Sequence, residues 1–268
     1  MLQLSALYRF PVKSLGGERL RRAEVDALGL AGDRRWMVVD AASGRFLTQR
    51  QYGRMAQIAA LWLDPATLHL GAPGRPGLRV AVPPADRALR EVVVWRDSLA
   101  VPDAGDAAAQ WLSEFLGQDC RLVHVPESRA RQVDPAYAQD GDRVGFADGF
   151  PLLLIGQASL DDLAARVGRS LDMLRFRPNL VVEGAAPYAE DGWRRLRIGS
   201  VEFEVVKPCS RCAIPTLDPH SGARGDDGEP LRTLASYRRD ADGVYFGQNL
   251  IQRGGGMLEV GMPVTLLD

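Results

Sequence analysis

Short stretches that alternate between apolar and polar residues, separated by glycine and proline, make up most of the chain. The first, residues 2–12, alternates loosely, contains Leu, Tyr, Phe and Val, and leads into a turn with two adjacent glycines. Short strands with turn signals about every 8–12 residues are typical of a sheet or barrel. The strands expected in the first half cover residues 2–12, 19–26, 34–40, 59–63, 67–70, 78–82, 91–95 and 121–125.

Helical periodicity is confined to a few segments. Apolar residues recur at helical spacing over residues 106–116, where Asp106 is expected to cap the helix and a glycine to end it. Ser159 is expected to open a second helix that runs to about residue 167, and a short helix is expected over 170–174. The pattern therefore predicts a mainly β protein with a few helices, of the α+β class.

A long polar stretch, residues 126–147, divides the chain. We interpret it as a crossover, and loops of this length are often functional. Residues 150–156 then form an uninterrupted apolar run, which predicts a strand buried on both faces. Two modules are expected, at about 1–125 and 126–268. The later strands are predicted at 180–183, 197–206, 245–249 and 257–267.

Composition and charge narrow the functional classes. The 268 residues are 46% apolar and carry a net charge of −1, which argues against nucleic-acid binding through a global basic field. Three cysteines are too few for a disulfide framework, so a reducing, cytoplasmic location is expected. The N-terminus lacks the features of a signal peptide, and we expect no membrane anchor. Lys13 and Lys207 are the only lysines, against 31 arginines.

Residues 205–219 hold the main candidate chemistry, a Cys-x-x-Cys pair at the end of a predicted strand. Cys209 and Cys212 are flanked by Lys207 and Arg211, and thiolates are soft metal ligands that cations stabilise. A structural zinc site would need about four ligands, and a redox dithiol would open a helix, which the nearby prolines disfavour. A single functional thiolate beside a structural cysteine is the preferred interpretation, with zinc and dithiol chemistry as alternatives.

Cations and hydroxyls also stand at the ends of other predicted strands. These positions are Lys13 with Ser14, Arg34, Arg177 with Asn179, and Ser210 with Arg211. The proline that follows Arg177 is expected to hold that residue extended. Arginine suits phosphate and pterin-like edges through bidentate hydrogen bonds, so these groups together could hold a phosphorylated cofactor with a thiolate at its reactive end. Because arginine is frequent throughout the chain, composition alone does not justify this assembly.

Several short motifs, taken together and in order, carry a resemblance. They are residues 11–14 (PVKS), 32–36 (GDRRW), 48–51 (TQRQ), 157–160 (QASL), 176–179 (FRPN), 209–212 (CSRC), 216–219 (TLDP) and 246–249 (FGQN). In this order they resemble the MOSC family, named after the molybdenum-cofactor sulfurase C-terminal domain, preceded by that family's N-terminal β-barrel module. The branch they resemble most includes the mitochondrial amidoxime-reducing component and its bacterial relatives.

The resemblance implies an N-terminal β-barrel-like module, a C-terminal MOSC β-barrel and a molybdenum–pterin cofactor in the cleft between them. It implies that Cys212 ligates the molybdenum and is catalytic. Cys209 is expected to be structural, because a proline-flanked strand end should aim only one of the two side chains inward. Residues 148–151 match a segment that contacts cofactor in relatives, but no hydroxyl side chain precedes the proline here, so any contact is expected to use backbone. The family positions that hold the cofactor correspond to Lys13, Ser14, Arg34, Arg177, Asn179, Ser210, Arg211 and Cys212.

The activity implied by the resemblance is removal of oxygen from N-hydroxylated small molecules. No iron–sulfur cluster is expected in this chain, so electrons would come from a separate ferredoxin-like protein or a cytochrome or flavoprotein reductase. Two alternatives stay open: a persulfide carrier that uses Cys212, and a module that binds or delivers the molybdenum cofactor. A complete sulfurase would also need a pyridoxal-phosphate domain, for which 268 residues leave no room.

Overall fold

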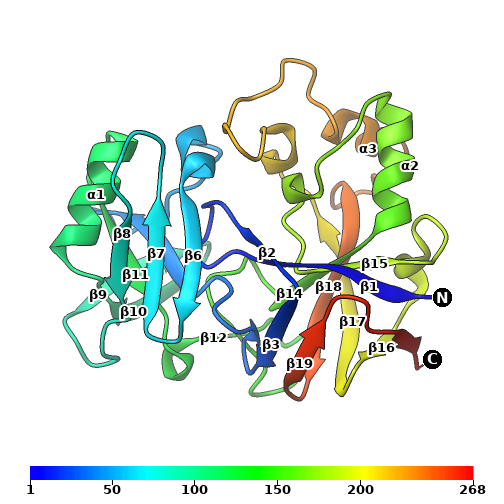
Figure 1. Ribbon diagram of the computed structural model, residues 1–268, viewed down its shortest axis with the longest axis horizontal. Coiled ribbons are helices and arrows are strands. Elements are labelled where there is room, and N and C mark those ends of the chain that lie inside the picture. Colours follow the sequence, from blue (N-terminus) through cyan, green and yellow to red (C-terminus); the bar gives the residue numbers. More distant parts are fainter. Residues whose placement is uncertain (268) are drawn as a thin grey trace.

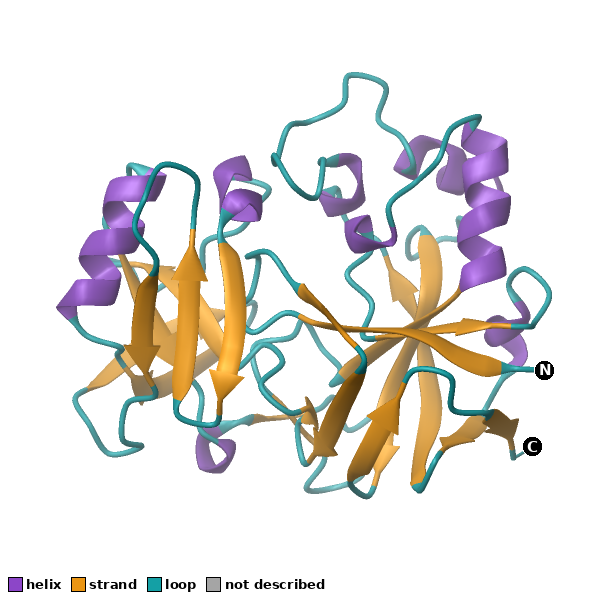
Figure 2. Ribbon diagram, in the orientation of Figure 1, coloured by secondary structure: helices purple, strands orange, loops and turns teal. Residues whose placement is uncertain are grey.

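The computed structural model describes residues 1–267. Strands make up most of the regular secondary structure, and three α-helices lie at its periphery within these residues (Figure 2). The mainly β class with a few helices is confirmed. No helix in the described range is both long and apolar enough to cross a bilayer.

An eight-stranded sheet forms the larger part of the molecule and appears on the right of Figure 1. Strands β14 and β15 are parallel, whereas the remaining neighbours are antiparallel. Every residue of β14 is buried, which confirms the prediction from its apolar run. The order is β2 (Glu18–Leu20), β1 (Gln3–Arg9), β15 (Leu180–Glu183), β14 (Leu152–Gly156), β18 (Tyr245–Arg253), β17 (Val201–Ser210), β16 (Arg195–Ile198) and β20 (Val264–Leu266).

The first strands of the chain pair with strands from its second half. β1 lies beside β15, and β3 (Arg22–Asp26) lies between β19 (Gly256–Glu259) and β4 (Gly29–Leu30). In Figure 1 the blue N-terminal strands therefore lie among green, yellow and red ones. The spatial units do not follow the two halves of the sequence, and the boundary near residue 125 stays a prediction about sequence modules.

Smaller sheets form the other end of the molecule. Their strands are β5 (Trp36–Asp40) with β11 (Cys120–His124), β6 (Ala59–Asp64) with β7 (Thr67–Gly71) and β8 (Leu78–Ala81), and β9 (Leu89–Val94) with β10 (Asp97–Pro102). A core around Trp36, Met55 and Leu112 joins β5, β6, β7, β8 and β11 to helix α1, whereas β9 and β10 pack into the adjoining core with Met37 and Val123. Among the strands of these smaller sheets, β10 alone was not predicted, because it begins with exposed polar residues directly after a two-residue turn.

The two long helices have the expected positions but different N-terminal caps. α1 (Asp106–Leu116) and α2 (Gln157–Val167) are preceded by glycines and have no side-chain cap at their N-termini, so the N-cap predictions were wrong. The prediction that a glycine ends α1 is confirmed, since Gly117 caps its C-terminus in a left-handed conformation. Asp106 instead accepts a hydrogen bond from Arg121 (2.8 Å), and the buried Ser159 hydroxyl donates to Glu190 (2.7 Å). The short helix after α2 is the 3-10 turn η3 (Met173–Arg175). α3 (Leu231–Tyr237) was not predicted, since it follows a glycine- and acid-rich stretch.

The crossover at 126–147 is held in place rather than free. It contains a 3-10 turn, η2 (Glu127–Arg129), and a small hairpin of β12 (Arg131–Gln132) and β13 (Arg143–Val144). The buried Arg131 guanidinium donates to the carbonyl of Gly145 at 2.8 Å and 3.1 Å. The remaining 3-10 turns are η1 (Gly53–Gln57), η4 (Ala189–Gly192) and η5 (Ile214–Thr216).

Candidate functional site

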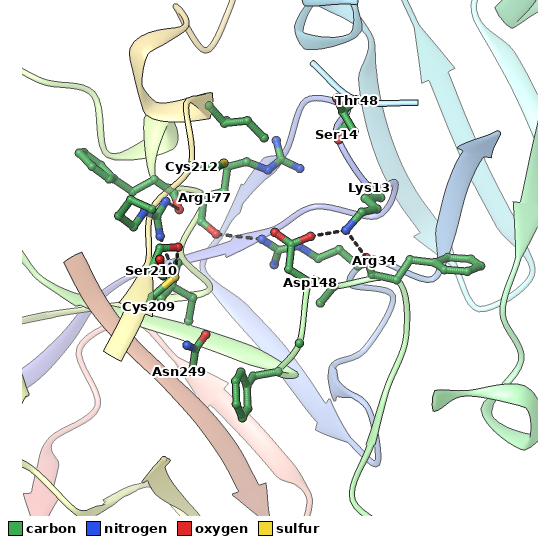
Figure 3. Close-up of a pocket in the computed structure, with 18 of the residues that line it drawn as sticks. Lys13, Ser14, Arg34, Thr48, Asp148, Arg177, Cys209, Ser210, Cys212 and Asn249 are labelled. Atoms are coloured by element: carbon green, nitrogen blue, oxygen red, sulfur yellow. Dashed lines mark hydrogen bonds and ion pairs between the residues drawn. The ribbon is translucent and has the colours of Figure 1, made fainter. Parts of the chain in front are cut away.

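A single pocket brings the predicted site residues together. It encloses about 830 Å³ of empty space, including solvent at its mouth, and its walls come from both ends of the molecule (Figure 3). All eight positions that the sequence singled out line it: Lys13, Ser14, Arg34, Arg177, Asn179, Ser210, Arg211 and Cys212. The structure thus groups these residues, while their role as cofactor ligands stays a prediction.

The cysteine pair enters the pocket from the end of β17, as expected. This strand pairs with β18 irregularly around Pro208, and Cys212 follows its last residue, half-buried in the lining. Cys209 lines the pocket as well and also packs against the core cluster around Phe176 and Phe246, so its structural role stays a prediction. Arg211 lies against this second thiol, with Nη1 3.1 Å from Cys209 Sγ, and donates through Nη2 to the carbonyl of Phe176 (2.7 Å).

Lys13 forms an ion pair with Asp148 within the pocket. The lysine is buried and donates to the Phe146 carbonyl (2.8 Å), while Asp148 also accepts from Trp95 Nε1 (3.1 Å). Burial lowers the pKa of Lys13. Partial desolvation opposes ionisation of Asp148, but the attraction of Lys13 outweighs it and holds the pKa of this carboxyl well below its usual range. A carboxylate side chain therefore stands where only a backbone contact was expected.

Three site residues adopt left-handed backbone conformations. The φ angles are 65° for Ser14, 45° for Arg34 and 55° for Arg177, a region that residues other than glycine rarely adopt. The prediction that Pro178 holds Arg177 extended was wrong. Arg34 Nη2 donates to the carbonyl of Arg177 (2.9 Å), so a contact between distant segments helps to hold this peptide. Backbone strain of this kind persists where the surroundings fix it, and it gathers at functional sites.

Arg34 and Asn179 form a network that joins the two ends of the molecule. Arg34 Nη1 donates to Asp33 (2.7 Å) and to Asn179 Oδ1 (3.0 Å). The buried Asn179 accepts from the Leu153 amide (3.2 Å) and donates to the carbonyl of Tyr8 (3.2 Å). Because both ends of its amide are engaged by protein, Asn179 orients Arg34 and ties β1 to β14.

Some polar atoms in the lining have no hydrogen-bond partner among residues 1–267. They are Thr48 Oγ1, Arg177 Nη2 and Arg211 Nε, all buried. Burial and the nearby Arg34 lower the pKa of Arg177 to about 9. An anion at these N–H and O–H groups would satisfy them and stabilise the charged guanidinium.

The pocket lining is mainly positively charged, so it attracts the same kind of ligand as the unpartnered donors. Asp148 is the only carboxylate among its residues, whereas five cations line it: Lys13, Arg34, Arg50, Arg177 and Arg211. The donor set therefore suits a polyanionic ligand with a soft centre near the thiols.

Other lining residues were not predicted as site residues. Thr48, Arg50 and Asn249 belong to motifs that the sequence did contain, so those motifs were the available signal. Asp148 lies in the segment 148–151, from which only a backbone contact was expected, because the role of its side chain depends on the distant Lys13. Lys207, which was considered as a cation beside the thiols, instead lies over the ring of Tyr137, 4.4 Å from the ring centroid.

Comparison with known proteins defines the class to which this arrangement belongs. Residues 1–119 match the MOSC N-terminal beta barrel domain, and residues 141–265 match the MOSC domain. The chain belongs to the MOSC family.

Individual relatives resemble the chain over nearly its full length. It is 37% identical to mitochondrial amidoxime-reducing component 1 of Mus musculus and 36% identical to that of Homo sapiens, in each case over 98% of this chain and 82% of the relative. It is also 32% identical to the molybdenum cofactor sulfurase of Oryza sativa subsp. japonica, over 92% of this chain but only 32% of that protein.

Proposed function

We propose that this chain is a molybdenum-cofactor-dependent reductase that removes oxygen from N-hydroxylated compounds such as hydroxylamines, amidoximes and N-hydroxylated bases. The observation that carries the proposal is the position of the Cys212 thiol in one pocket with five cationic side chains. The relatives named for amidoxime reduction support it. Electrons would come from a separate redox protein, and the expected cytoplasmic location stays a prediction, since those relatives are named as mitochondrial.

The residues present fit such a cofactor. Cys212 would supply the thiolate ligand, and the buried donors of Arg177 and Arg211 would bind the phosphate and pterin edges. Lys13 and Arg34 add positive charge, with Ser14 and Ser210 as hydroxyl donors. When bound, the molybdenum–pterin group supplies the two-electron chemistry by which R–NHOH, two electrons and two protons give R–NH2 and water.

The side chains of Lys13 and Asp148 determine which groups of the pocket carry a proton. Because the pKa of Asp148 lies well below its usual range, this carboxylate is ionised at neutral pH and Lys13 Nζ carries the proton shared by the pair. The buried rings of Phe146 and Phe176 form apolar parts of the pocket lining, whereas the Asp148 side chain is 69% exposed to solvent. The pocket thus combines cationic side chains that can bind an anion with apolar side chains in the same lining.

The test uses protein produced in a host that makes the molybdenum cofactor. Molybdenum per chain is measured by mass spectrometry, and reduction of benzamidoxime is followed with a reduced viologen dye, so that no natural partner is needed. We expect about one molybdenum per chain and measurable turnover, both lost in Cys212→Ala. Cys120→Ala is the matched control, since Cys120 is buried in the core around Trp36, Met55 and Leu112 and does not line the pocket. A wild-type protein that holds molybdenum but reduces no N-hydroxylated compound would refute the reductase.

A second candidate function is supported by the second thiol in the pocket. Both Cys209 and Cys212 line it, and the chain is similar to a protein named molybdenum cofactor sulfurase. We propose as the alternative that Cys212 carries a persulfide, or that the chain binds or delivers the cofactor. Intact-mass analysis showing one added sulfur atom on metal-free protein, lost in Cys212→Ala, would favour the carrier. Cofactor retained without turnover would favour delivery.

A further inference from the structure

The tip of the β9–β10 hairpin carries an unusual residue. Trp95 was expected to end a strand, but it occupies the first position of a two-residue turn, with φ 56° and 43% of its surface exposed. Two-residue hairpin turns favour glycine where φ is positive, because a side chain is strained there. The chain thus keeps a large aromatic side chain at a position where glycine fits the backbone better.

Trp95 is fixed at the rim of the pocket. Its Nε1 donates to Asp148 (3.1 Å), its ring centroid is 5.1 Å from that of Phe46, and the Arg50 guanidinium carbon lies 5.0 Å from its ring. Asp148, Phe46 and Arg50 all line the pocket. Lys13 Nζ also lies 5.7 Å from the centroid of the Trp95 ring, so four contacts orient an indole that remains close to half exposed beside the pocket.

The core beneath the hairpin does not need this side chain. Val92, Val94 and Val101 of β9 and β10 are buried and fill the adjoining core cluster. Lys13, at the base of the pocket, is held by the Phe146 carbonyl and by Asp148. The exposed part of the indole is therefore available to a ligand, and an indole with fixed orientation offers a flat apolar surface at little entropic cost.

We propose that Trp95, supported by Phe46, is a specificity-determining platform. It selects N-hydroxylated compounds whose reacting group is attached to a flat aromatic ring over aliphatic compounds with the same reacting group. The inference rests on the proposed reductase function and adds a substrate preference to it. Trp95 acts by stacking on the part of the substrate that does not react.

The test compares two amidoximes, benzamidoxime and acetamidoxime, which differ in the group that carries the reacting centre. Binding is measured by calorimetry on molybdenum-loaded protein without an electron donor, and kcat/KM with a reduced viologen dye. Trp95→Leu is expected to weaken benzamidoxime binding and lower its kcat/KM about tenfold, mainly through KM, because a stacking contact is lost. Acetamidoxime should change less than about twofold, and Trp95→Phe should retain most of the preference.

Two further variants separate the platform from folding effects. Trp95→Gly removes the indole while relieving the strained turn, so it should lose the preference without a lower melting temperature. Arg96→Leu alters the neighbouring turn residue, which is also exposed, and should leave the preference intact. Equal effects of Trp95→Leu on both amidoximes, or none, would overturn the platform. Wild-type protein that binds benzamidoxime through Trp95 but reduces neither compound would overturn the reductase and leave the platform standing.

Discussion

Replacing Arg177 with methionine is expected to stabilise the cofactor-free protein, although it removes a residue of the candidate site. Arg177 lies in a left-handed backbone conformation, with its Nη2 buried and unpartnered among residues 1–267. Its Nη1 donates to the Leu15 carbonyl (2.7 Å), and its guanidinium carbon lies 4.1 Å from the Phe10 ring centroid. Methionine has a similar length and no charge to desolvate.

The magnitude follows from the opposing contributions. Burial and Arg34 lower the pKa of Arg177 from 12.5 to about 9, which corresponds to at most about 5 kcal/mol disfavouring the charged form. Solvent screens part of this, because the side chain is only partly buried. The lost hydrogen bond and cation–π contact are each worth about 1 kcal/mol. We therefore expect Arg177→Met to gain about 2 kcal/mol, a rise of roughly 5 °C in melting temperature.

The assay is thermal unfolding of cofactor-free protein at pH 7, with Arg175→Met as the matched control. Arg175 Nη1 donates to the carbonyls of Pro215 (3.1 Å) and Leu217 (2.7 Å), so its loss should lower the melting temperature. Inorganic pyrophosphate should raise the melting temperature of wild-type protein and leave Arg177→Met nearly unchanged. Destabilisation of Arg177→Met as large as that of Arg175→Met would refute the reasoning.

The pH dependence of this effect has a definite sign. A cation whose pKa is lowered by folding destabilises the folded state while it is charged, so the penalty is fully present below about pH 9. It fades as pH rises from about 9 towards the unfolded value of 12.5. The advantage of Arg177→Met over wild type should therefore be largest near neutral pH and shrink by pH 10. An advantage that grows with pH would contradict the assignment to Arg177.

Two further predictions concern stability elsewhere in the fold. Gly247→Ala should lose about 3 kcal/mol in urea unfolding, since φ is 80° and an added Cβ would lie 2.7 Å from an Ile155 side-chain atom. Gly254→Ala, with φ 100° and no atom within 4 Å of the added Cβ, should lose only about 1 kcal/mol, and equal losses would exclude the steric explanation. Burial and Arg35 lower the pKa of His124 to about 4, so its neutral form stabilises the fold above pH 6.5 and this contribution is lost as pH falls towards 4. Between pH 7 and pH 4.5 the free energy of unfolding, measured with urea, should fall by about 2 kcal/mol less in His124→Phe than in wild type. An equal fall in both proteins would contradict this.

Local sequence patterns were sufficient to predict the elements whose stability is local. The apolar face at 106–116 predicted α1 at its observed bounds, and the apolar run before residue 157 predicted the fully buried β14. The glycine that ends α1 was predictable, whereas the N-terminal caps were not, because Ser159 donates to the buried Glu190 instead. That contact depends on a loop thirty residues away, which periodicity does not describe.

The pairing of distant strands was also beyond local pattern. β1 alternates as any half-buried strand does, and nothing in residues 3–9 indicates a partner at residues 180–183. The motifs predicted the polar residues of the pocket well, since each stands at a strand end or turn. They did not predict the side-chain role of Asp148, which depends on Trp95 and on Lys13, a residue 135 positions away in the sequence.

The strain at Ser14, Arg34 and Arg177 connects these observations. Tertiary contacts hold the three residues in conformations that their own side chains disfavour, and all three line the same pocket. Since the Arg34 guanidinium joins Asp33 to the peptide of Arg177 and to Asn179, the donors are oriented by protein contacts alone. A ligand that satisfies the unpartnered N–H groups would then need little rearrangement of the chain. The stability lost to buried charge and strain is concentrated where an anion would recover it, which is why removing Arg177 should stabilise the protein and abolish its response to pyrophosphate.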